Sequence, residues 1–167
     1  ANFTSGPISV IVPDANAAGN TSNITVSGIP ANCNVSGIAV TWNMTHTWDG
    51  DMVFAIRSPN GQILNLDYHL TNTGGTGPTT GFVNTTVSSA GVNALSTGTG
   101  TYTGTFRADA AGAASAPPAG PTAFPPTVTT WTPMYTPLPN GPWTLAMYDG
   151  GAADVGTLTN WSITIEY

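Results

Sequence analysis

The carboxylates offer the clearest chemistry in this sequence, because five of its eight acidic residues lie at the ends of predicted loops. These five are Asp49, Asp51, Asp109, Asp149 and Asp154. Calcium takes about six to eight oxygen ligands from carboxylates, backbone carbonyls and water. The chain has two arginines and no lysine to balance such a group. Clustered carboxylates would therefore repel one another unless a cation joined them.

This pattern predicts a bound calcium ion, held by loop carbonyls and by the carboxylates of Asp51, Asp109, Asp149 and Asp154. The segment 150–153 between the last two acids is Gly-Gly-Ala-Ala and is flexible enough to curl around an ion. The alternative is ordinary turn chemistry, since aspartate favours turns by bonding its own backbone. Asp49 is the member of the group that we expect to serve only its turn.

Catalysis has little support, because His46 and His69 are the only histidines that could act as a general base. His46 falls on the apolar side of a predicted strand, so we expect it in the core, bonded to a backbone carbonyl or a hydroxyl. We expect His69 to form a solvated pair with Asp67. No serine stands in the local context of a subtilisin-like protease or a nucleophile elbow. The chain is expected to contain no catalytic residue and to be no enzyme by itself.

Short strands must position these residues. The segment 38–48 alternates strictly, with Ile, Val, Trp, Met, His and Trp on one side and Ala, Thr, Asn, Thr and Thr on the other. An Asp-Gly hairpin signal follows, and 51–58 is expected to return as its partner strand. Further strands are expected at 8–12, 23–27, 63–68, 81–88, 101–107, 142–148 and 159–166. About eight short strands without a helical period predict an all-β antiparallel sandwich.

The chain is expected to be a single domain over 1–167, with the Ala/Pro-rich segment of about 108–142 as a long surface loop whose aromatic residues pack back onto the sheet. A net charge of −6 leaves no basic patch for nucleic acid. No apolar run reaches the length of a membrane-spanning helix. The single cysteine, Cys33, excludes an internal disulfide and a cysteine-based zinc cage, and we expect it to be partly buried.

Three parts of the chain together resemble a known family. The first is 40–61, a strand, a Gly-Asp turn, a second strand and a Ser-Pro-Asn-Gly turn. The second is 105–109, with the pattern Phe-x-x-Asp. The third is 140–149 followed by 154–163, with Gly-Pro-Trp-Thr-Leu and then Gly-Thr-Leu-Thr-Asn-Trp. In this order and spacing they are similar to the P/Homo B domain of subtilisin-like proprotein convertases and of many secreted bacterial proteases.

The resemblance implies a jelly-roll-like β-sandwich that often carries calcium and helps a subtilisin-like catalytic domain in the same chain to fold and stay folded. It also implies a secreted or cell-surface protein. The sequence departs from the family in its long Ala/Pro-rich loop, its near-absence of basic residues, and Ala108, where many bacterial members have a second acid. The alternative is a free-standing extracellular adhesion module that binds another protein or a glycan.

Overall fold

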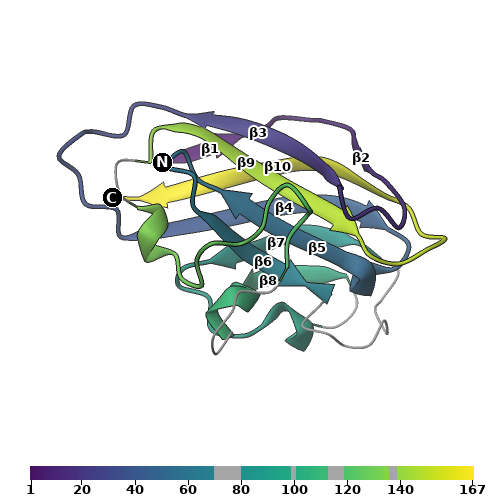
Figure 1. Ribbon diagram of the computed structural model, residues 1–167. Coiled ribbons are helices and arrows are strands. Elements are labelled where there is room, and N and C mark those ends of the chain that lie inside the picture. The colour runs from purple at the N-terminus through teal and green to yellow at the C-terminus, as the bar shows by residue number, and fades with distance from the viewer. Residues whose placement is uncertain (70–79, 99–100, 113–118, 136–138) are drawn as a thin grey trace.

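The structure is a computed structural model that describes residues 1–69, 80–98, 101–112, 119–135 and 139–167 (Figure 1). Within these ranges the chain forms ten strands and four short 3₁₀ turns. The strands are β1 (Asn2–Thr4), β2 (Val10–Val12), β3 (Asn20–Val26), β4 (Gly37–His46), β5 (Met52–Arg57), β6 (Ile63–Tyr68), β7 (Phe82–Ser88), β8 (Tyr102–Phe106), β9 (Gly141–Asp149) and β10 (Gly156–Glu166). The turns are η1 (Asp49–Asp51), η2 (Leu95–Thr97), η3 (Asp109–Gly112) and η4 (Thr132–Met134).

The strands form two sheets that pack face to face. The six-stranded sheet has the order β1-β10-β4-β7-β8, with β2 also paired to β10, and the four-stranded sheet has the order β3-β9-β5-β6. The β7–β8 pair is parallel, and the other strand pairs are antiparallel. This arrangement confirms the predicted all-β sandwich. The described residues hold more strands than the expected eight partly because β1, with three residues, is too short to show alternation.

The predicted hairpin between 38–48 and 51–58 is wrong. β4 lies in the six-stranded sheet and β5 lies in the four-stranded sheet, so the 3₁₀ turn η1 carries the chain across the sandwich. The reason lies in burial: β4 alternates between buried and more exposed residues, whereas every residue of β5 before Arg57 is buried. A strand with two apolar faces needs cover on both, and the middle of the other sheet provides it.

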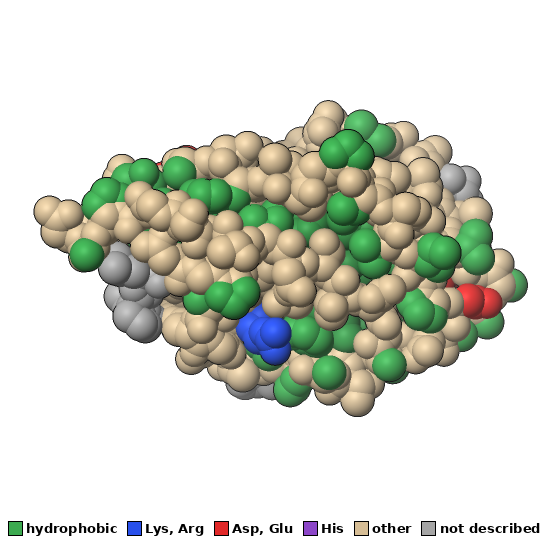
Figure 2. Space-filling view, turned by 90° about the horizontal axis from the view of Figure 1, so that it is seen from above, with side chains coloured by type: hydrophobic (Ala, Val, Ile, Leu, Met, Phe, Trp, Pro, Cys, Tyr) green, Lys and Arg blue, Asp and Glu red, His purple; other side chains and the backbone are tan. Residues whose placement is uncertain are grey.

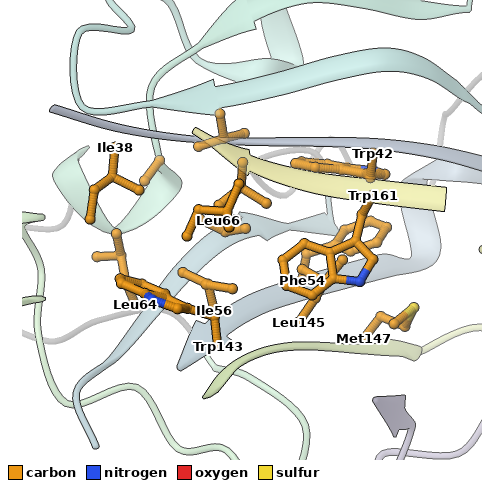
Figure 3. Packing of buried hydrophobic residues seen from close by; sticks show 14 of the residues in the cluster. Ile38, Trp42, Phe54, Ile56, Leu64, Leu66, Trp143, Leu145, Met147 and Trp161 are labelled. Atoms are coloured by element: carbon orange, nitrogen blue, oxygen red, sulfur yellow. The ribbon is translucent and has the colours of Figure 1, made fainter. Parts of the chain in front are cut away.

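The core lies between the sheets and is rich in aromatic side chains. Trp42 and Trp161 of the six-stranded sheet point toward Phe54, Leu145 and Met147 of the four-stranded sheet (Figure 3). The rings of Trp42 and Phe54 are 4.8 Å apart between centroids, a separation at which aromatic pairs add to the stabilisation from burial. The alternation predicted for 38–48 is thus confirmed through β4, whose even-numbered residues are buried.

Part of the segment 108–142 covers the outer face of the four-stranded sheet. Phe124 packs in a small apolar cluster with Ala55, Ile63 and Ala146, and the Arg57 guanidinium lies 4.7 Å from the centre of its ring. Farther along, Trp131 and Met134 join the main core. The described residues contain no helix that is long and apolar enough to cross a membrane.

Candidate functional site

Strand pairing brings several acidic residues to one end of the sandwich. His46 ends β4 and pairs with Gly156 at the start of β10, while Met52 at the start of β5 pairs with Asp149 at the end of β9. The turn η1 and the β9–β10 connection therefore meet at this end. Figure 2 shows one small acidic patch at the right-hand end of a face that is otherwise mostly uncharged apart from a basic patch near its middle.

Asp149 forms the buried centre of this region. Its carboxylate and the His46 imidazole are both fully buried, with 3.2 Å between Oδ2 and Nε2. The Trp48 N–H donates to Nδ1 of His46 at 3.0 Å, so Nε2 carries the hydrogen and donates it to Asp149. Oδ1 of Asp149 accepts the Gly151 N–H at 3.0 Å. Burial raises the pKa of Asp149, and these donors act against that rise.

Asp51 and Asp154 are at the same end of the sandwich but are more exposed than His46 and Asp149. Burial raises the pKa of the half-buried Asp51, and the negative charge of Asp154 raises it further. The Asp51 backbone carbonyl accepts the Gly150 N–H at 2.8 Å, which places η1 against the β9–β10 connection that carries Asp154. Asp154 accepts a hydrogen bond from Thr47 Oγ1 at 2.8 Å. No described residue donates a hydrogen bond to the Asp51 carboxylate. A side chain at Gly151 would collide with that carboxylate, so the glycine is what allows the β9–β10 connection to approach Asp51.

Asp109 is positioned by a different part of the chain. It begins η3, which packs against β6, and its Oδ2 accepts the backbone N–H of Tyr68 at 2.9 Å. It is not among the charges that shift the pKa of Asp51 or Asp149. The described side chains form no group of three or more His, Cys, Asp or Glu residues that could hold a metal ion. The structure thus places Asp51, Asp149 and Asp154 at the same end of the sandwich and Asp109 beside β6.

Asp49 has a role that sequence reasoning missed. It is fully buried, and its two oxygens accept the Gly81 N–H at 3.1 and 3.0 Å. Burial raises its pKa to about 6, in spite of the backbone donors at Gly81 and Thr80 and the nearby His46. It ties η1 to the start of β7 instead of serving its own turn. The sequence signal that could have indicated this role is the glycine at position 81. In the structure Gly81 adopts a positive φ directly before β7.

The two histidines behave differently from each other. His46 is in the core, as predicted, but its partners are a carboxylate and a backbone N–H. The expected solvated pair of His69 and Asp67 is wrong. Asp67 pairs with Phe54 across β5 and β6, so the two side chains share the core face, and Asp67 is fully buried. His69 is half-exposed, and its proximity lowers the pKa of Asp51.

The fold and this end of the molecule define an all-β sandwich domain with an acidic end. No family model and no curated protein matches the chain. A solved structure is similar to it: a chain in the crystal structure of the Aeromonas sobria serine protease in complex with the chaperone ORF2, with 10% sequence identity and a TM-score of 0.50. The match covers 99% of this chain and 26% of the other, so this chain spans about a quarter of its length. At this identity the likeness shows the fold alone.

Proposed function

We propose that the chain is a non-catalytic accessory domain of the P/Homo B type, part of a secreted or cell-surface protein and in the first place of a serine endopeptidase. Two observations support the proposal. The resembling segments 40–61, 140–149 and 154–163 fall on β4, β5, β9 and β10, which pair with one another in the middle of the two sheets. The similar solved chain belongs to a serine protease–chaperone complex. The domain would dock onto the catalytic domain of its own chain and stabilise it.

The surroundings of His46 support a non-catalytic role. A general base must reach the proton of a nucleophile or of a substrate. His46 is 4% exposed, and each of its ring nitrogens is bonded within the fold, one to Asp149 and one to Trp48. The pair therefore works as a structural lock between β4 and β9.

We also propose that the acidic end binds calcium through Asp51 and Asp154. The observation that carries this step is the Asp51 carboxylate, which lies against Gly151 of the β9–β10 connection and accepts no hydrogen bond from a described residue. The negative charge of Asp154 acts on it as well. Loop carbonyls would supply further oxygen ligands. Asp149 would not bind the ion directly, because its two oxygens already accept hydrogen bonds from His46 and Gly151. Bound calcium would tie η1 to the β9–β10 connection.

Thermal unfolding tests the calcium site. A ligand that binds only the folded state adds about 2.7 kcal/mol of stability at a hundredfold excess over its Kd. The Tm should fall on chelation and recover with calcium but not with magnesium, which needs a stricter octahedral shell. Asp51→Asn and Asp154→Asn should remove this response, while Glu166→Gln, at the other end of β10, should keep it. Equal Tm values with and without calcium, and no binding heat at millimolar calcium, would show that these acids bind no ion.

The accessory role is tested separately in the full-length protein. A subtilisin-like domain elsewhere in the same chain is expected, and deletion of 1–167 should lower its Tm or its soluble yield. A parent protein made only of other β-modules would favour the alternative, an extracellular adhesion module. One observation favours that alternative: the outer face of the six-stranded sheet is almost free of charge, since its strands carry no Asp, Glu, Lys or Arg except Glu166.

A further inference from the structure

Two irregularities in the six-stranded sheet meet at Asn43. On one side, Leu158 pairs with Met44 and Asn160 pairs with Asn43, which leaves Thr159 as an extra residue in β10. Leu158 and Trp161 are buried, so the two residues between them both face outward. This is the pattern of a β-bulge, which re-aims side chains locally. The bulge turns the Asn160 side chain toward Asn43.

The same happens on the other side of β4. Phe82 pairs with Met44 and Thr85 pairs with Trp42, so β7 places two residues opposite Asn43. The second of them, Asn84, is exposed and has a φ of 47°, a left-handed conformation that an L-residue adopts at some cost. A left-handed residue inside a strand does not stabilise the pairing of that strand with its neighbours. Two bulges and one strained residue thus deliver an amide from each neighbouring strand to the same point.

The three amides are bonded to one another. Asn43 Nδ2 donates to Oδ1 of Asn84 at 3.1 Å and to Oδ1 of Asn160 at 2.9 Å. Asn43 Oδ1 accepts the backbone N–H of Asn84 at 2.8 Å. Asn43 therefore uses both of its amide hydrogens to hold the other two side chains in place. We refer to Asn43, Asn84 and Asn160 as the asparagine cluster.

The cluster presents unused donors to solvent. The Nδ2 groups of Asn84 and Asn160 donate to no described residue, and each carries two N–H groups. Next to the cluster, strand register aligns Ser162, Thr41 and Thr86 across three strands, and the two threonine hydroxyls are 2.8 Å apart. The result is a preorganised array of amide donors and hydroxyl groups on a face without charge.

We propose that the asparagine cluster is a binding subsite for a neutral polysaccharide. Sugar hydroxyl groups accept hydrogen bonds from amide N–H groups and donate to hydroxyl oxygens, which is what this face offers. In a protein with a net charge of −6, an uncharged face matches an uncharged polymer and disfavours an anionic one. The cluster residues include no aromatic side chain for a sugar ring to stack on, so a single sugar binds weakly and a polymer gains from repeated engagement. This site does not depend on the accessory role or on calcium.

Affinity electrophoresis tests the proposal on the protein produced in bacteria. The gels contain a mixed-linkage glucan, xyloglucan, galactomannan or soluble starch, with polygalacturonate as the anionic comparison. Asn84→Gly removes one free amide and accepts the positive φ without strain, and Asn160→Ala removes the other. Asn34→Ala, an exposed asparagine in the β3–β4 connection, is the matched control.

At least one neutral polymer should retard the wild type and the Asn34→Ala variant, while polygalacturonate should not. The double variant should bind about fivefold more weakly or worse, as expected when hydrogen bonds to the ligand are lost. If the double variant does not melt like the wild type, Asn84→Gly alone decides. The proposal is overturned if no neutral polymer retards the wild type, if the variants bind as the wild type does, or if size-exclusion chromatography shows a dimer that the same substitutions abolish.

Discussion

Buried Asp49 should make the protein more stable in mild acid than at neutral pH. The folded state holds the proton of Asp49 with a pKa of about 6, against the usual 3.8. Because the folded state binds this proton more tightly, the stability from this group is complete below pH 3.8 and is lost as the pH rises through about 6. The difference corresponds to about 3 kcal/mol over the whole range. About 1 kcal/mol of it is lost between about pH 5 and pH 7.5.

The variant that isolates this effect is Asp49→Asn. Asparagine has the shape of a protonated aspartate, and its Oδ1 can still accept the Gly81 N–H. Burial also raises the pKa of Asp51 and Asp149, so the wild-type stability falls with pH for more than one reason. The difference between wild type and variant reports Asp49 alone. We therefore expect the fall in unfolding free energy between these two pH values to be smaller by about 1 kcal/mol in Asp49→Asn.

Urea unfolding with a chelator present, at several pH values across this range, measures the effect without any contribution from calcium. Asp14→Asn is the control, because it removes the charge of an exposed carboxylate at the same end, where Asp14 accepts the Ala153 N–H. If Asp49→Asn and the wild type lose the same free energy over this range, the buried carboxylate does not hold its proton in the way argued. A parallel fall in the control and the variant would point to net charge as the cause.

Two further substitutions test the buried lock and the close approach of the β9–β10 connection. His46→Ala should lower the free energy of unfolding by about 3 kcal/mol, because it leaves the Asp149 carboxylate buried without its histidine partner. His69→Ala should lower it by less than about 1 kcal/mol. Equal shifts in the urea midpoint for the two variants would contradict the placement of His46 in the core. Gly151→Ala should lower the free energy of unfolding by about 1 kcal/mol or more, since the added Cβ would meet the Asp51 carboxylate. It should also reduce the rise in Tm that calcium causes. An unchanged urea midpoint and an unchanged rise in Tm would show that the β9–β10 connection does not approach Asp51.

The sequence predicts the sandwich well because each strand has its own alternation. The buried positions of β4 follow directly from the residue types in 38–48, and so does the place of His46 among them. What alternation cannot predict is which sheet a strand joins. The chain between β4 and β5 has the residues of a hairpin turn, yet the two strands pair with β10 and with β9. The sheet that β5 joins depends on where both of its faces can be buried, and the strands and the loop that bury them are distant in sequence.

The acidic residues show the same limit. Their positions at strand ends could be predicted, but whether a carboxylate is free to meet an ion depends on which donors face it. Asp67 is buried because it pairs with Phe54, and the register irregularity that sets this pairing leaves no mark in the sequence. The two bulges around Asn43 are likewise invisible to a period of two, since each adds one outward residue to a strand that otherwise alternates.

The carboxylates of this end differ in how their charge is satisfied, and that difference separates structural acids from candidate ligands. Asp49 and Asp149 are buried against backbone N–H groups of Gly81 and Gly151, which stabilise the charged form at a fixed distance. Such a carboxylate gains little from a cation, because binding would break bonds that already exist. The backbone carbonyl of Asp51 accepts the Gly150 N–H, but its carboxylate accepts no hydrogen bond from a described residue and feels the negative charge of Asp154. A cation between these two would relieve their repulsion and break no bond at Asp51. An ion is therefore expected to bind at Asp51 and Asp154, while the buried Asp49 and Asp149 hold the surrounding backbone in place.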